Sequence, residues 1–148
     1  MMPSDVQLSY RRSAIQGASP IGLVIALYDT LSGDLRRAAS AIRSHDIEKR
    51  CAELNHASAV LGQLEDWIDV KSDGRLAESL SAFYGYLRAR MMEAALRQSD
   101  SLLDEQIDLI LLVRAAWQER DGISSAGSAL SNQPLSADIK IQSVSAQQ

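Results

Sequence analysis

The chain contains few of the residues on which disulfide-rich domains, metal centres and membrane proteins depend. Its 148 residues include one cysteine, Cys51, which excludes an internal disulfide, and only two histidines. Aromatic residues make up 5% of the chain. No uninterrupted apolar stretch is long enough to cross a bilayer, and residues 1–12 hold no apolar run of signal-peptide length. These absences predict a cytoplasmic protein without membrane insertion.

The chain also lacks a concentrated charge of one sign. Its formal net charge is -4, and its basic residues are scattered among acids. Because nucleic-acid binding needs a concentrated positive field, the sequence predicts no nucleic-acid partner. The hydrophobic share of 46% is typical of a globular protein, and the length fits one domain that buries its core without metal or disulfide support.

Apolar residues at helical spacing dominate the segment from Pro20 to about Ser44. Ser19 and Pro20 suit the N-cap and the first position of a helix. One stripe recurs in a strict 3,4 pattern: Ile21, Val24, Tyr28, Leu31, Leu35, Ala38 and Ile42. Leu23 and Leu27 widen this stripe on one flank. A bundle helix needs one buried face, so the wider face predicts contact with another polypeptide.

Two further amphipathic segments follow. Asp46 is a suitable N-cap for the second, and the turn from Lys71 to Gly74 separates it from the third. The second stripe consists of Ile47, Cys51, Leu54, Ser58, Leu61 and Ile68, with Val60, Leu64 and Trp67 alongside. The third consists of Leu76, Leu80, Phe83, Leu87, Met91 and Ala94, with Tyr84 and Tyr86 flanking. Within this repeat Cys51 is expected to be a small buried hydrophobe.

The fourth segment is apolar on two sides. Ser101 and Asp104 resemble a capping box at its start, and we expect the helix to end near Gln118 to Arg120. Its stripe is Leu103, Ile107, Ile110, Val113 and Trp117, with Leu102, Leu109 and Leu112 on a second side. From Asp121 onward Ser, Ala, Gly and Gln prevail, which predicts a tail too weakly hydrophobic to offset its ordering entropy.

Short connections between these long segments favour antiparallel neighbours. The sequence therefore predicts an all-α, up-down-up-down four-helix bundle with an N-terminal docking segment and a disordered C-terminal tail. The expected organisation is residues 1–19 as the N-terminal segment, 20–119 as the bundle and 120–148 as the flexible tail.

Helical histidines call for a test of metal and phosphoryl chemistry. Glu53 and His56 form one Glu-x-x-His pair, half the ligand set of a di-iron bundle, but His45 provides no second pair. Phosphorelay domains place a Lys and a Gly soon after the histidine, whereas the run from His56 to Gly62 holds no cation. The sequence predicts no catalytic, cofactor-binding or metal-binding residues, and thus a protein that is not an enzyme.

Several short segments together resemble a known family. They are Tyr10, Ala18-Ser19-Pro20, Leu27-Tyr28-Asp29, Ala38-x-x-Ala41-Ile42, His45-Asp46-Ile47-Glu48, Leu80-x-x-Phe83-Tyr84-x-Tyr86-Leu87, Glu93-Ala94, Leu103-Asp104-Glu105 and Trp117. In this order and spacing they resemble the flagellar export chaperone FliS family over about residues 8 to 119. The chain departs from the family at Thr30, where glycine is common, and at Ala95, where asparagine is frequent.

The resemblance implies a specific partner. Family members bind the disordered C-terminal segment of flagellin, which prevents premature polymerisation and keeps flagellin competent for the flagellar type III export gate. The expected partner-binding residues are Tyr10, Ile15, Leu54, Leu61, Leu64, Leu80, Tyr84 and Leu87. The segment around Tyr10 is expected to cover part of the groove when no client is bound. A helical scaffold or self-associating adaptor, forming a homodimer without a secretion client, is the alternative.

Overall fold

A computed structural model of the chain describes residues 19–71 and 74–131. The predictions for the N-terminal segment, including Tyr10 and Ile15, and for the tail after residue 131 lie outside these ranges. The described residues form four helices: α2 (Pro20–Arg43), α3 (Ile47–Lys71), α4 (Gly74–Arg97) and α5 (Asp100–Ser131). None of these helices is long and apolar enough to cross a membrane.

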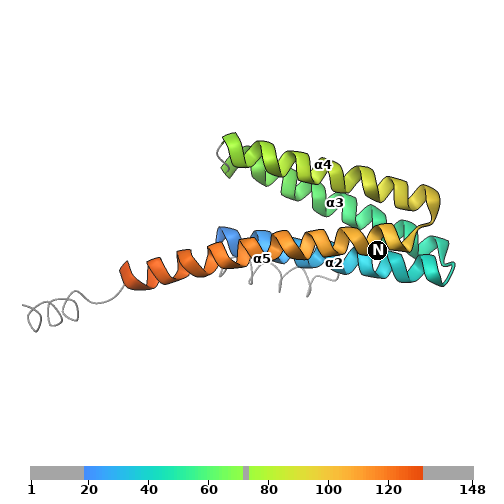
Figure 1. Ribbon diagram of the computed structural model, residues 1–148, viewed down its shortest axis with the longest axis horizontal. Coiled ribbons are helices and arrows are strands. Elements are labelled where there is room, and N and C mark those ends of the chain that lie inside the picture. The colour runs from blue at the N-terminus through green and yellow to red at the C-terminus, as the bar shows by residue number, and fades with distance from the viewer. Residues whose placement is uncertain (1–18, 72–73, 132–148) are drawn as a thin grey trace, which may run out of the picture.

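The helices form the predicted antiparallel bundle (Figure 1). α2 packs closely against both α3 and α5, while α4 contacts α3 and α5 from the opposite corner. Consecutive helices run in opposite directions because their connections span only a few residues. The up-down-up-down, all-α prediction is therefore confirmed.

The start and the buried face of α2 follow from its sequence. Ser19 Oγ accepts a hydrogen bond from the backbone N–H of Gly22 at 2.9 Å, and Pro20 occupies the first turn, where its missing N–H costs nothing. The central part of the predicted stripe is almost fully buried. Its most buried members are Val24, Tyr28, Leu31, Leu35 and Ala38. The predicted stripe of α2 thus lies in the core.

α2 and α4 end in the same way, each with a non-glycine residue in the left-handed region. The φ angles are 59° at His45 and 52° at Gln98. After α2, the N–H of Asp46 bonds to the carbonyl of Ala41 at 2.8 Å, and after α4 the N–H of Ser99 bonds to the carbonyl of Ala94 at 2.9 Å. These are Schellman closures, in which glycine is the usual residue.

The predicted burial is wrong at the start of α3. Ile47 is 62% exposed and Cys51 is exposed. Periodicity places both on one helix face, but it cannot show how far a neighbouring helix covers that face. Ile47 instead lines an open pocket between the α2–α3 and α4–α5 turns.

The predicted end of the fourth helix is also wrong, because α5 continues to Ser131. Ser19 Oγ donates a hydrogen bond to Asp121 Oδ1 at 2.6 Å, so Asp121 lies beside the start of α2. The later turns of α5 project past the bundle (Figure 1). No proline lies between Asp100 and Pro134, and extending an existing helix is far easier than nucleating one.

Candidate partner-binding surface

Six of the predicted partner-binding residues lie inside the bundle. They are Leu54, Leu61, Leu64, Leu80, Tyr84 and Leu87, none more than 9% exposed. The periodicity of α4 predicts Tyr84 at the edge of the stripe, whereas the structure places it in the core at 1% exposure. In this arrangement these side chains support the surface without forming it. Their role in partner binding stays a prediction.

An ion pair defines where α4 and α5 face each other at the surface. Arg90 Nη2 on α4 lies 3.4 Å from Glu105 Oε2 on α5. Phe83 and Tyr86 lie seven and four residues before Arg90, so they share its helix face. Tyr86 is 48% exposed and Phe83 is half-buried against the core. These two aromatic side chains therefore border α5.

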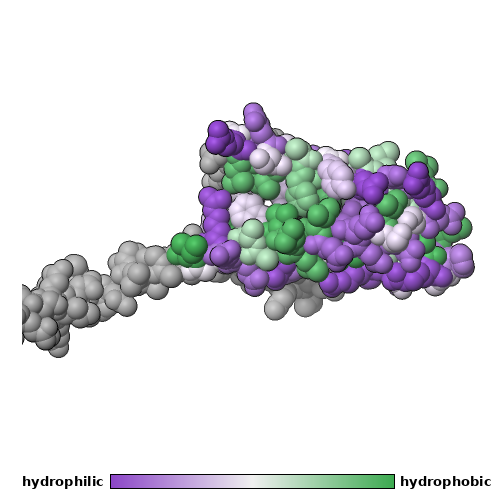
Figure 2. All heavy atoms as spheres, viewed as in Figure 1, coloured by the Kyte–Doolittle hydropathy of each residue, from purple (hydrophilic) through white to green (hydrophobic). Residues whose placement is uncertain are grey.

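The facing side of α5 is apolar as well. Leu109, Leu112 and Ala116 lie four, seven and eleven residues after Glu105, which places them on one face. Leu112 is 69% exposed, although leucine is a preferred core residue. The α4–α5 seam is defined here as Phe83, Tyr86, Leu109, Leu112 and Ala116. Figure 2 shows hydrophobic side chains gathered over α5 and the adjoining part of α4 in this half of the molecule.

Charged groups mark both ends of the seam. Arg90 also pairs with Glu93 at 2.6 Å, so ion pairs occupy the α4–α5 boundary nearest the turn between these helices. At the far end the Arg120 guanidinium lies 6.0 Å from the Trp117 ring centre, and Ile123 is 70% exposed one turn later. The seam is thus an apolar strip with a polar border, which is typical of protein-binding surfaces.

A pair of buried tyrosines lies beneath the seam. The hydroxyl groups of Tyr28 and Tyr84 are 2.9 Å apart, and their rings meet edge to face at 6.2 Å. Burial raises the pKa of both phenols. Both hydroxyls therefore stay neutral, and each satisfies the other in the core.

The network at Asp34 joins α2 to α3. Asp34 is 1% exposed, and its carboxylate lies 2.5 Å from His56 Nδ1 and 2.7 Å from Arg37 Nη2. Arg37 also pairs with Glu53 at 3.0 Å. Glu53 and His56, the residues of the Glu-x-x-His pair, therefore each bind a charged partner on α2. Asp34 is not identified as a buried residue from the sequence. An acidic residue among the apolar residues of α2 is nevertheless a signal of a buried polar contact.

Comparisons with known proteins agree on one family. Residues 2–124 match the family described as "Flagellar protein FliS". "Flagellar secretion chaperone FliSB" of Pseudomonas aeruginosa is 32% identical over 110 residues, covering 74% of this chain and 85% of that protein.

Two more distant relatives bear the same kind of name. "Flagellar secretion chaperone FliS" of Salmonella typhimurium is 28% identical over 108 residues, covering 72% of this chain and 80% of its own. The Bacillus subtilis protein of that name is 25% identical over 111 residues, covering 75% of this chain and 82% of that protein. The resemblance seen in the sequence is confirmed: the chain belongs to the FliS family of flagellar proteins.

Proposed function

We propose that this chain is a cytoplasmic export chaperone that binds the disordered C-terminal segment of flagellin. Binding prevents premature polymerisation and keeps flagellin competent for flagellar type III secretion. The α4–α5 seam is the observation that carries this proposal, because Tyr86 and Leu112, two large apolar side chains, are exposed there. The names of the relatives, flagellar secretion chaperones, support it.

The seam has the dimensions of a helix-binding site. From Leu109 to Ala116 the α5 side of the seam runs about 11 Å at 1.5 Å per residue, the span of residues i to i+7 of a helix. A client segment that folds into a helix places residues i, i+3, i+4 and i+7 along such a strip. Burying these side chains offsets the entropy that the disordered client loses on folding.

The partner-binding residues predicted from the sequence are not among the seam residues, and we assign them two different roles. Tyr84 and Leu87 support the seam from the core. Tyr10 and Ile15 lie outside the described residues, and we propose that their segment covers part of the groove when no client is bound. The chaperone then brings its client to the export gate.

A matched pair of charge substitutions tests the site. Leu112→Glu places a charge in the seam, whereas Leu96→Glu places the same charge at an 84% exposed leucine on the side of α4 away from it. We expect the wild type and Leu96→Glu to bind a flagellin C-terminal peptide and raise its helicity. Leu112→Glu should weaken binding at least tenfold, about 1.4 kcal/mol, since a charge is buried without a partner.

Calorimetry and far-UV circular dichroism provide the measurements. No binding by the wild type contradicts the proposed function, while equal weakening by both variants contradicts the seam as its location. The alternative, a self-associating adaptor, uses the same exposed leucines. It predicts a homodimer in sedimentation experiments that Leu112→Glu dissociates, together with no affinity for the flagellin peptide.

A further inference from the structure

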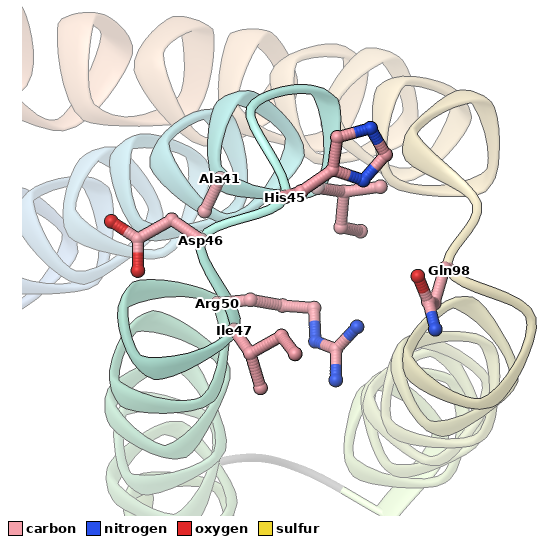
Figure 3. A pocket seen from close by; sticks show the side chains of 7 residues that line it. Ala41, His45, Asp46, Ile47, Arg50 and Gln98 are labelled. Atoms are coloured by element: carbon pink, nitrogen blue, oxygen red, sulfur yellow. The ribbon is translucent and has the colours of Figure 1, made fainter.

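A small pocket lies at the end of the bundle where the α2–α3 turn and the α4–α5 turn come together. The Arg120 end of the α4–α5 seam lies toward the other end of the bundle. The pocket has a volume of about 60 Å³, and one wall is apolar, formed by Ala41, Ile42 and Ile47. That volume suits a small chemical group better than a whole side chain of a large residue. Figure 3 shows the side chains of Arg50 and Gln98 reaching toward the same space from different segments.

Arg50 on α3 is the central polar group of the pocket. Its guanidinium lies between the two turns, near Gln98 in the view of Figure 3. Within the described ranges the guanidinium has no ion pair, and its Nε is buried without a hydrogen-bond partner. Arg50 carries a permanent charge, and a buried donor of this kind is costly to leave unpaired. The pocket therefore holds a cation without an ion pair, and one of its donors, Nε, is buried and unsatisfied.

Two further polar residues line the pocket. His45 and Gln98 enter from the two Schellman turns, each at a position where glycine relieves the backbone. The Asp46 carboxylate points away from Arg50, and its Oδ1 accepts the backbone N–H of Lys49 at 3.1 Å. It leaves the guanidinium unneutralised.

We propose that this pocket binds a carboxylate carried on a short alkyl stem, such as a glutamate side chain of a partner polypeptide. The planar guanidinium matches the two oxygens of a carboxylate. Gln98 supplies an amide donor, and the apolar wall accommodates the alkyl stem. A phosphate, with more charge and more acceptors, needs more donors than this pocket supplies. The inference is independent of the α4–α5 seam and of flagellin.

Nuclear magnetic resonance of the full chain tests the assignment with sodium propionate as the probe. We expect the Nε–Hε signal of Arg50 and the side-chain amide of Gln98 to shift and to saturate with a dissociation constant on the order of millimolar. Sodium chloride at equal ionic strength is the screening control, and sodium phosphate is the competing oxyanion.

Three variants make the result specific. Arg50→Gln should abolish the propionate-induced shift of the Gln98 amide signal. Arg50→Lys keeps the charge but loses the planar guanidinium, so it should weaken propionate binding several-fold. Lys49→Gln removes the same charge from the exposed neighbouring residue and should leave binding unchanged. The assignment is overturned by an equal response to chloride, by tighter binding of phosphate than of propionate, or by a shift that persists in Arg50→Gln.

Discussion

At the scale of single residues, two buried tyrosine hydroxyl groups form a polar contact inside the apolar core. Tyr28 and Tyr84 are both almost fully buried, and each hydroxyl has the other as its partner. A buried hydroxyl without a partner costs about 1–3 kcal/mol, whereas an apolar pair of the same shape is nearly neutral. The two tyrosines are therefore expected to depend on each other.

A double-mutant cycle tests this dependence. Tyr28→Phe or Tyr84→Phe alone should lower the free energy of unfolding by about 1–3 kcal/mol, because the remaining hydroxyl loses its partner. The double variant should lose much less than the sum of the two single losses. Urea denaturation followed by circular dichroism gives the three values. Additive losses would show that the hydroxyl pair contributes nothing specific.

At the scale of elements, polar links fix how α2 sits against its two neighbours. Asp29 pairs with Arg114 of α5 at 2.5 Å, and Asp34 pairs with His56 of α3. Exposed pairs add little stability. Asp34 differs, since it is 1% exposed, and burial raises the pKa of its carboxyl against the opposing influence of His56 and Arg37.

The raised pKa of Asp34 predicts a direction of pH dependence. With a raised pKa the folded state holds this proton more tightly than the unfolded state, so its stabilising contribution falls as pH rises above the unfolded value of about 3.9. The free energy of unfolding of Asp34→Asn should therefore rise relative to that of the wild type as pH increases above about 4. Denaturant titrations across this range measure the difference. Parallel curves would rule out Asp34 as a source of the dependence.

At the scale of the whole molecule, one contiguous core joins all four described helices. Leu35 is fully buried in α2, the helix that packs against both α3 and α5. A cavity at this position is therefore felt by several elements at once, and the bundle is expected to unfold as one unit.

Leu35→Ala measures this cooperativity. We expect a loss of about 2–5 kcal/mol in the free energy of unfolding, with coincident transitions by circular dichroism and tryptophan fluorescence. Trp67 on α3 and Trp117 on α5 report on different helices. Leu96→Ala, at an 84% exposed position, should stay within about 0.5 kcal/mol of the wild type. Separate transitions would instead indicate helices that unfold independently.

The sequence predicts which residues share a helix face, but it does not predict which of these faces a neighbouring helix covers. Leu112 was placed on a second apolar side of its helix, and the structure shows it exposed. Gln106 was missed, because a polar residue at 1% exposure gives no hydrophobic signal. Ile47 and Cys51 have the right period for burial, but none of the four described helices covers them.

Local spacing alone determined the four helices and their antiparallel order, because apolar period, caps and short turns are encoded within a few residues of each other. The tertiary structure decided which apolar residues lie in the core and which remain in the α4–α5 seam. It also brought Arg50 and Gln98 into one pocket and placed Asp34 beside His56. Such pairings join distant parts of the chain, and they depend on how helices are rotated and offset, which periodicity leaves free.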